Sequence, residues 1–312
     1  MSSERLNEFL ILQNQDISSL LAQFDNSLVI LNFSLMKDGM SNTGYMLTTN
    51  SGKYLIKLYS NTTDKIETAT YRYLENKINI PRLFYYDGSK QKFPYAFTII
   101  EYLDGVSLTD SVRAKGAFQE DVIYRIGEMC AKIHSKKYDF NAHLDDDLNA
   151  IINIPDTCAR IRFLLNEKPK AYLKPETIKK LQNYIELKSS LFDRINAESV
   201  LCHGDLGYGN IMIVDSKIYF IDFEFAYAGS RYHDIGHFFR RKEDDIQSLI
   251  NSDIYNNFVD GYNSVSNEPL PSDWLQLARL CDIAPMLCLL NRDNVPNEWV
   301  SDIEYDILNT IS

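Results

Sequence analysis

The chain has 312 residues, enough for about two domains, and its 45% hydrophobic and 24% charged residues are typical of a globular protein. Its net charge is −11, and its short basic run, Arg240–Lys242, is followed at once by the acidic residues 243–245. Because proteins bind nucleic acid phosphates through clustered basic residues, nucleic acid is not expected as a partner.

The cysteines and the apolar runs exclude further classes of protein. The five cysteines are odd in number and form no C-x-x-C pair, which argues against a disulfide framework and a structural zinc site. We expect them to be small apolar core residues. The sequence starts without the residue order of a signal peptide, and no apolar run approaches the ~18 residues of a membrane span. The sequence therefore predicts a cytoplasmic protein with no membrane partner.

The first hundred residues are predicted to form a small β-rich region. Short β-branched or aromatic runs between turn residues predict strands, and helical spacing of apolar residues predicts one helix after the third strand. The expected elements are strands Val29–Phe33, Tyr45–Thr49, Tyr54–Tyr59, Leu83–Tyr86 and Phe97–Tyr102, and helix Thr63–Lys77.

The rest of the chain is predicted to be mostly helical. Apolar spacing predicts helices at Glu120–Lys136, Glu176–Ile195 and Leu275–Leu290, whereas short apolar runs return between residues 199 and 225. We therefore predict an α+β protein with two lobes. Residues 1–103 would form a β-rich N-terminal lobe, and residues 104–312 a helical C-terminal lobe.

The polar loop 203–210 carries the strongest chemical signal. Asp205 is followed five residues later by Asn210, and the apolar runs 211–214 and 218–221 then lead to Asp222. A hairpin made of these two runs would bring Asn210 and Asp222 close together at its open end. Mg²⁺ prefers oxygen ligands, which Asn210 and Asp222 supply, while Asp205 stays free to accept a proton. This division between a base and two metal ligands is typical of eukaryotic-type kinases.

The pattern H-G-D-L-x-x-x-N, followed by I-D-F-E, Gly229 and Asp234, resembles the aminoglycoside phosphotransferase and choline kinase family. The resemblance extends over nearly the whole chain. It implies a protein-kinase-like fold, with a small antiparallel β-sheet lobe that binds the nucleotide. The larger, mostly helical lobe would hold the catalytic loop and the acceptor site.

The resemblance implies an ion pair in the N-terminal lobe. Lys57 in YLIKLY matches the strand lysine that holds the α- and β-phosphates. Glu67 matches the helix glutamate that pairs with this lysine.

Two further segments of the N-terminal lobe are implied to contact the nucleotide. The polar loop 37–44 lies where the family has its phosphate-covering loop, and Asn42 and Thr43 resemble its signature positions. The loop lacks G-x-G-x-x-G, so a plain β-turn is the alternative. Glu101 and Leu103 fall at the hinge, whose backbone groups bind adenine in this family.

Five other polar residues are expected to be structural. By resemblance, His203 hydrogen-bonds the catalytic loop, Asp234 braces the loop backbone, and His134 ends a helix. His233 and His237 have the spacing of a metal pair but lack a third ligand, so we expect them on a helix surface.

The sequence departs from the family pattern at two pairs of residues. Gly207-Tyr208 stands where many members have His-Pro or a similar pair, and Ser230-Arg231 stands where members often have Asp-Pro. Neither change removes a reacting group, whereas both could reshape the acceptor pocket. The identity of the acceptor therefore stays open.

The predicted function is transfer of the γ-phosphoryl group of ATP to a hydroxyl of a small molecule, with GTP as an alternative donor and Mg²⁺ as the metal. Aminoglycosides, choline or ethanolamine, sugars and amino alcohols are all acceptors in the family, in antibiotic resistance or in metabolism. The acidic stretches 145–147 and 243–245 would suit a cationic acceptor, although such stretches are usually solvated faces. Both a monomer and a homodimer are compatible with the sequence.

Rival functions lack their motifs. The chain contains neither G-x-x-x-x-G-K-[ST] nor a strand followed by G-x-G-x-x-G, and no D-F-G…A-P-E segment suggests a protein acceptor. A non-catalytic nucleotide-binding module on the same fold remains the alternative. The intact set Lys57, Glu67, Asp205, Asn210 and Asp222 argues against it.

Overall fold

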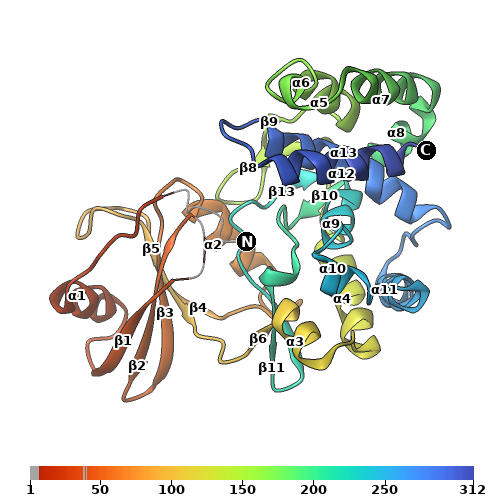
Figure 1. Cartoon of the computed structure of the whole chain (residues 1–312). Helices are drawn as coiled ribbons and strands as arrows, with labels where there is room; N and C mark the ends of the chain where they lie inside the picture. The colour runs from red at the N-terminus through yellow and green to blue at the C-terminus, as the bar shows by residue number, and fades with distance from the viewer. Residues whose placement is uncertain (1–6, 38, 40) are drawn as a thin grey trace. The chain divides into compact units, whose positions relative to one another are not determined.

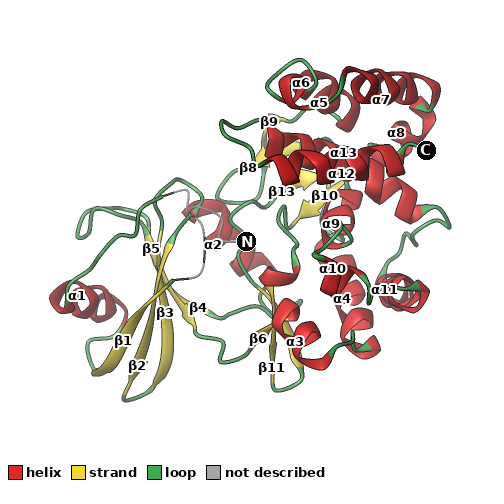
Figure 2. Ribbon diagram, viewed as in Figure 1, coloured by secondary structure: helices red, strands yellow, loops and turns green. Residues whose placement is uncertain are grey.

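The computed structural model describes residues 7–37, 39 and 41–312 of the chain. The chain forms two compact units. The sheet unit comprises residues 1–106, 145–149 and 211–225, and the helical unit comprises residues 107–144, 150–210 and 226–312. Figures 1 and 2 show strands dominating the first unit and helices the second, as the sequence predicts. The division of the lobes at residue 103 stays a prediction.

The sheet unit is built on a five-stranded antiparallel sheet with the order β1-β2-β3-β5-β4. All five strands overlap those predicted, and the predicted helix is present as α2. The elements of this unit are α1 Asn14–Phe24, β1 Ile30–Met36, β2 Thr43–Thr49, β3 Gly52–Leu58, α2 Asp64–Leu74, β4 Leu83–Asp87, β5 Phe97–Glu101, β11 Ile211–Val214 and β12 Lys217–Phe220.

Helix α1 covers part of this sheet and was not predicted. Its Ile17, Leu20 and Leu21 are buried in one apolar cluster with Leu47 of β2 and Ile56 of β3. Alternate residues of β2 are buried, as a strand with one face in the core requires. This buried face holds β3 and β5 in place, and β3 carries the predicted lysine.

The predicted hairpin at residues 211–221 is present. Strands β11 and β12 pair antiparallel from Ile211↔Phe220 to Val214↔Lys217. The two residues of the turn, Asp215 and Ser216, have φ angles of 46° and 65°, as a two-residue hairpin turn requires. The hairpin adds to Val106–Ser107 (β6) in a three-stranded sheet with the order β12-β11-β6.

The helical unit contains a second five-stranded sheet, with the order β7-β10-β13-β8-β9, and a set of packed helices. Its elements are α3 Leu108–Lys115, α4 Glu120–Ile133, β7 Lys137–Tyr138, β8 Ala142–Leu144, β9 Ala150–Asn153, α5 Thr157–Leu164, α6 Pro169–Tyr172, α7 Pro175–Leu187, α8 Ser189–Ile195, β10 Ser199–Cys202, the 3₁₀ turn η1 Tyr208–Asn210, β13 Tyr227–Gly229, α9 Arg231–Phe238, α10 Asp244–Gln247, α11 Ser252–Val265, α12 Trp274–Leu290 and α13 Asn297–Thr310.

Two glycines set the distance between α4 and α11. A Cβ atom on Gly127 would collide with the Phe258 carbonyl oxygen, and one on Gly261 with the Tyr124 carbonyl oxygen. Only glycine permits this close packing of the two backbones. The helix predicted at residues 176–195 is instead two helices, because Lys188, with φ −118° and ψ 29°, breaks the helical path between α7 and α8.

The cysteine prediction is wrong for one residue. Cys130, Cys202 and Cys281 are buried as expected and Cys158 is half-buried, but Cys288 is exposed. Sequence spacing does not show which face of α12 is exposed, so it placed this residue incorrectly. Within the described ranges, no helix combines the length and apolar character needed to span a membrane.

Candidate active site

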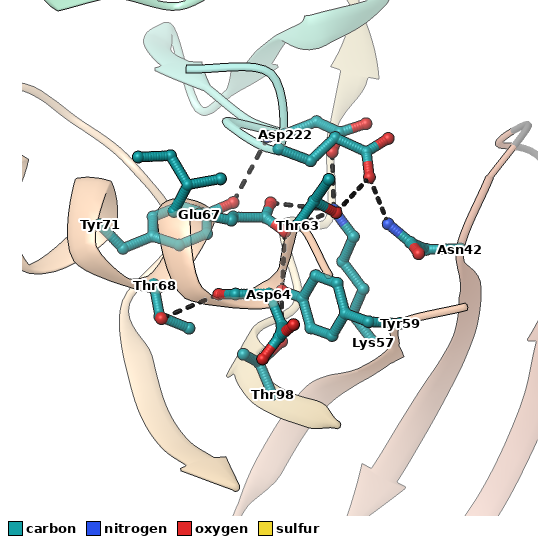
Figure 3. Close-up of polar contacts among 12 residues, drawn as sticks. Asn42, Lys57, Tyr59, Thr63, Asp64, Glu67, Thr68, Tyr71, Thr98 and Asp222 are labelled. Carbon is teal, nitrogen blue, oxygen red and sulfur yellow. Dashed lines mark hydrogen bonds and ion pairs between the residues drawn. The ribbon is translucent and has the colours of Figure 1, made fainter. Parts of the chain in front are cut away.

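Lys57 lies at the centre of a polar cluster in the sheet unit (Figure 3). Its Nζ atom donates hydrogen bonds to the two carboxylate oxygens of Glu67 at 2.9 and 2.8 Å and to Oδ1 of Asp222 at 2.6 Å. Glu67 comes from α2 and is fully buried, whereas the Asp222 side chain, just after β12, is 36% exposed. Residues far apart in the sequence thus surround one ammonium group. The predicted pairing of Lys57 with Glu67 is confirmed.

The two carboxylates keep Lys57 charged. Burial alone would lower the pKa of Lys57, but the charges of Asp222 and Glu67 raise it well above its usual value. Burial raises the pKa of Glu67, and the charge of Lys57 opposes this rise. The ammonium is therefore a permanent cation, the state that phosphate binding requires.

Asp222 has an unusual backbone conformation. Its φ angle is 67°, in the left-handed region that few residues other than glycine adopt. Its N–H donates a 3.4 Å hydrogen bond to the Tyr71 hydroxyl of α2, and the Tyr71 ring meets that of Phe223 edge-on. These contacts hold the strained turn that presents the Asp222 carboxylate to Lys57. Such strain is common at functional sites.

Glu224, two residues after Asp222, received no role from the sequence, although the I-D-F-E pattern contained it. It is 5% exposed, and its Oε2 atom accepts hydrogen bonds from Asn42 Nδ2 at 2.5 Å and from the Thr63 hydroxyl at 3.0 Å. Burial, together with the charge of Asp222, raises the pKa of Glu224. Glu224 therefore ties the predicted phosphate-covering loop to the segment after β12.

The other predicted nucleotide-binding residues differ in their surroundings. Asn42 Oδ1 accepts a hydrogen bond from the Ser60 N–H at 3.2 Å, so Asn42 is held at both ends of its amide. Thr43 is fully buried, and its hydroxyl accepts the Leu10 N–H at 3.1 Å. In the predicted hinge, the Glu101 N–H donates to Arg82 O at 2.9 Å, and Leu103 O accepts the N–H of Gly105 at 3.1 Å. Residues 38 and 40 of the predicted loop lie outside the described residues.

The catalytic-loop candidates lie together in the helical unit. The Asp205 side chain is 40% exposed. Asn210 Nδ2 donates to the Asp205 carbonyl oxygen at 2.7 Å and to its Oδ2 atom at 2.9 Å. Gly204 precedes Asp205 with a φ angle of 85°, where a side chain would be strained. The loop thus exposes one carboxylate whose orientation is set by an amide five residues later.

The predicted brace on this loop is confirmed. Asp234 is 1% exposed, and its carboxylate accepts the N–H groups of His203 at 2.7 Å and Gly204 at 3.0 Å. His134 Nε2 lies 3.1 Å from the same carboxylate. Burial alone would raise the pKa of Asp234, but the hydrogen bond with His134 and the nearby His233 imidazole hold it well below its usual range. His203 also contacts the loop, since its Nδ1 atom accepts the Asp205 N–H at 3.3 Å.

The expectation that His233 and His237 lie on a helix surface is wrong. His233 is 7% exposed and the His237 side chain 18%, because α9 contacts both α12 and β10. His237 Nε2 lies 3.4 Å from Oδ1 of Asp205. Burial, with the charges of Arg240 and Lys242, holds the pKa of His237 well below its usual value, so His237 is neutral near pH 7.

Comparison with protein families identifies the chain's relatives. The model of the phosphotransferase enzyme family matches residues 33–267, which is most of the chain. The chain belongs to this family. The phosphotransferase is therefore a small-molecule kinase with an alcohol group as acceptor, which confirms the predicted enzyme class. None of the curated sequences compared with it gives a significant match.

Solved structures share the fold of this phosphotransferase at low identity. Choline kinase from Cryptosporidium parvum Iowa II has a TM-score of 0.62 and 16% identity, covering 96% of this chain and 95% of its own. The streptomycin–ATP ternary complex of APH(2'')-IIa has a TM-score of 0.62 and 17% identity, with 96% and 97% covered. A thermostable mutant of APH(4)-Ia with ADP and hygromycin B has a TM-score of 0.67 and 12% identity, with 95% and 98% covered. The predicted two-lobed kinase-like fold is confirmed.

The departures from the family pattern have distinct surroundings in the phosphotransferase. Ser230 begins α9, and its hydroxyl donates to the Ile195 carbonyl oxygen at 2.6 Å. Arg231 donates to the Glu268 carbonyl oxygen at 2.7 Å. Gly207 lies beside His237, whose Nε2 atom would be 3.6 Å from an added Cβ. Tyr208 is 3% exposed, and its ring meets that of Phe238 at 4.9 Å.

The acidic stretches 145–147 and 243–245 lie on solvated faces, which was the alternative to their lining a pocket for a cationic acceptor. Asp145 Oδ1 accepts the N–H groups of residues 147 and 149 in its own turn. Glu243 and Asp245 are exposed, and both pair with Arg113. The carboxylates of Asp145, Glu243 and Asp245 are therefore already engaged, by their own turn or by Arg113.

Proposed function

We propose that this enzyme transfers the γ-phosphoryl group of ATP to a hydroxyl of a small molecule, with GTP as the alternative donor. The arrangement of Lys57 between Glu67 and Asp222 carries the proposal. A buried lysine with two carboxylate partners is a costly arrangement that phosphate binding explains. The ATP and ADP in the related solved structures further support a nucleotide donor.

In this proposal the predicted residues divide the chemistry among them. Lys57, oriented by Glu67, holds phosphate oxygens of the nucleotide. Asp205 orients the acceptor hydroxyl and receives its proton while the hydroxyl oxygen forms a bond to the γ-phosphorus. The bond between that phosphorus and the bridging oxygen breaks, and its electron pair leaves with ADP. The products are a phosphate monoester and ADP, and catalysis consists mainly of positioning and charge stabilisation.

The residues proposed for Mg²⁺ fit its chemistry. Asn210 uses its amide nitrogen on Asp205, and its amide oxygen accepts no hydrogen bond from the described part of the chain. Asp222 adds a partly exposed carboxylate. Mg²⁺ is usually bound by one or two protein oxygens, with waters and phosphates completing its shell. When bound, the ion would neutralise charge on the phosphate oxygens.

The test is ATP consumption by the purified chain against a panel of hydroxyl compounds. The panel contains aminoglycosides, choline, ethanolamine, sugars and amino alcohols. Asp205→Ala should lower kcat at least ~10³-fold while nucleotide affinity stays within about threefold, because the lost group acts on the acceptor proton. Asp260→Ala, which removes an exposed aspartate on α11, serves as the matched control.

Two outcomes would contradict the proposal. Full activity of Asp205→Ala would remove Asp205 from the mechanism. ATP binding without turnover of any acceptor would favour a non-catalytic nucleotide-binding module. Localisation in the cytoplasm and the choice between monomer and homodimer stay predictions.

A further inference from the structure

The Lys242 ammonium has an unusual environment in the helical unit. Lys242 lies four residues beyond the end of α9 and is half-buried. Its Nζ atom is 4.5 Å from the centre of the Tyr208 ring and donates a long 3.3 Å hydrogen bond to the His237 carbonyl oxygen. Within the described part of the chain, no carboxylate forms an ion pair with it. This ammonium therefore sits beside the catalytic-loop residues without the anion that usually accompanies a buried cation.

Three carboxylates of this region are already paired with arginines. Asp282, 3% exposed, accepts two hydrogen bonds from Arg240 at 2.7 and 2.6 Å. Asp302 and Asp306 both pair with Arg241. These pairs fix a guanidinium close to Lys242, and Asp205 acts on Lys242 through its charge without forming an ion pair with it in the described residues. Burial and the charge of Arg240 accordingly lower the pKa of Lys242 to about 8, although the charges of Asp282 and Asp205 oppose this.

A second polar group of the same region lacks a partner. The Tyr208 hydroxyl is buried and has no hydrogen-bond partner among the residues described. Tyr208 stands three residues after Asp205, in one of the pairs that depart from the family pattern. A buried hydroxyl normally finds a partner. An unpaired hydroxyl on the ring that the Lys242 ammonium contacts, with no carboxylate paired to that ammonium in the described residues, indicates a ligand that accepts from both.

A nearby cavity has the same excess of positive charge. Its volume is about 290 Å³, and its charged lining residues are Arg240, Arg241, Arg279, Asp282 and Asp306. Arg279 is exposed and forms no ion pair in residues 7–37, 39 and 41–312. Arg240 lines the cavity, and its charge also lowers the pKa of Lys242, so the cavity adjoins the surroundings of this ammonium. Apart from Asp205, the carboxylates that a cationic acceptor would meet at this cavity already form ion pairs with arginines.

We propose that the acceptor is a small hydroxy compound bearing an anionic group, a carboxylate or a phosphate ester, which the Lys242 ammonium and the Tyr208 hydroxyl bind. This inference rests on the proposed function, since Asp205 would receive the hydroxyl of the same molecule. The anionic group is not altered in the reaction. The hydroxyl oxygen gains the phosphoryl group, its proton goes to Asp205, and ADP leaves with the electrons of the broken bond. Lys242 and Tyr208 are thus specificity-determining residues.

The first test compares matched acceptors by ATP consumption of the full chain. D-glycerate and glycerol 3-phosphate are each compared with glycerol, and gluconate and glucose 6-phosphate with glucose. Choline, ethanolamine and aminoglycosides form the cationic arm. At least one anionic compound should have a kcat/KM at least about tenfold above that of its neutral counterpart, as a charge-assisted hydrogen bond provides. The carboxylate and phosphate arms identify the anion.

The second test changes the two proposed residues. Lys242→Met should raise the KM of the anionic acceptor at least about tenfold with kcat within about threefold. The reason is that Lys242 binds the anionic group equally in the bound acceptor and in the transition state. Tyr208→Phe should raise the same KM about threefold to tenfold. Lys179→Met, on the exposed face of α7, is the matched control and should change neither constant. Thermal unfolding of the unmodified protein with glycerol 3-phosphate, D-glycerate or glycerol gives a readout that requires no variant.

The outcomes separate this inference from the proposed function. Turnover of neutral or cationic acceptors alone would overturn the inference and leave the kinase function standing. An equal fall in kcat for every acceptor in Lys242→Met, with KM unchanged, would also overturn it, because Lys242 would then act on the transferred phosphoryl group. No turnover of any compound would overturn the proposed function, and the inference with it.

Discussion

The sheet unit and the helical unit treat their charged site residues differently. In the sheet unit, the Lys57 ammonium is saturated by Glu67 and Asp222, and Glu224 is bound by Asn42 and a threonine. In the helical unit, one carboxylate is fully engaged as a brace, whereas Asp205 is 40% exposed and Lys242 lacks an anion within the described ranges.

The difference separates two tasks. A site that always binds the same group can be assembled in advance, with charges that hold one another in place until a phosphate competes for the lysine. A site that selects an acceptor must leave groups available to it. On this interpretation the sheet unit is prepared for a constant partner, and the catalytic loop region is incomplete until its acceptor binds.

The largest expected effect is on stability, and it would separate the brace from the base. Asp234→Ala should lower the free energy of unfolding by about 3 to 5 kcal/mol, because two backbone N–H groups and His134 lose a buried carboxylate. Asp205→Ala should cost less than about 1 kcal/mol, since that side chain is partly solvated. Urea unfolding of both variants measures the difference. Equal losses would mean that Asp205 is as much a structural residue as Asp234.

A smaller loss of stability is expected from replacing Lys57, the cation that Glu67 and Asp222 share. Lys57→Met leaves the Glu67 carboxylate buried beside Asp222 and should cost about 2 to 3 kcal/mol of stability, together with most of the nucleotide affinity. The double variant Lys57→Met/Glu67→Gln should recover part of the stability but none of the affinity. Urea unfolding and equilibrium binding of ATP separate the two effects. Recovery of ATP binding in the double variant would contradict the proposal that Lys57 binds the phosphates of the nucleotide.

The smallest effect concerns pH and tests the helical unit. The pKa of Lys242 is lowered from 10.5 to about 8 in the folded chain, with Asp205, His237, Arg240, Asp282 and Tyr208 around it. Only the protonated form binds an anion, so kcat/KM for an anionic acceptor should fall about tenfold per pH unit above about pH 8. Lys242→Met should show no such fall, and neutral acceptors should show none with either protein.

The same pKa predicts a dependence of stability on pH. Between about pH 8 and 10.5 the unfolded chain holds a proton on Lys242 that the folded chain has released. The contribution of this residue to stability therefore increases with pH across that window and is lost as pH falls through 8. Urea unfolding of the unmodified protein and of Lys242→Met at pH 7 and 10.5 checks the sign. A difference between the two proteins that does not change with pH would contradict the low pKa.

The fold was largely predictable where local pattern determines structure. Alternation in Tyr45–Thr49 and amphipathic spacing in Glu120–Lys136 identified β2 and α4, because each buries one face. Helix α1 was missed, although Ile17, Leu20 and Leu21 have helical spacing.

The candidate site was predictable where its residues are contiguous or follow a family pattern. The pairing of Lys57 with Glu67 and the brace formed by Asp234 agree with the sequence. Glu224 was missed because its partner Asn42 is 182 residues away, a contact that no local pattern encodes. His237 was placed wrongly because two histidines on one helix do not reveal what covers that helix.

The sequence by itself determined the family and predicted a set of candidate reacting groups, since the loop 203–210 and the segment around Asp222 are short motifs that can be recognised without knowledge of the fold. Only the tertiary structure decided which charges are neutralised. Arg240 is matched by Asp282 and Lys57 by two carboxylates, whereas Lys242 has no such partner in the described chain. Charge pairing depends on distance and burial between residues remote in sequence, so composition and spacing cannot reveal it.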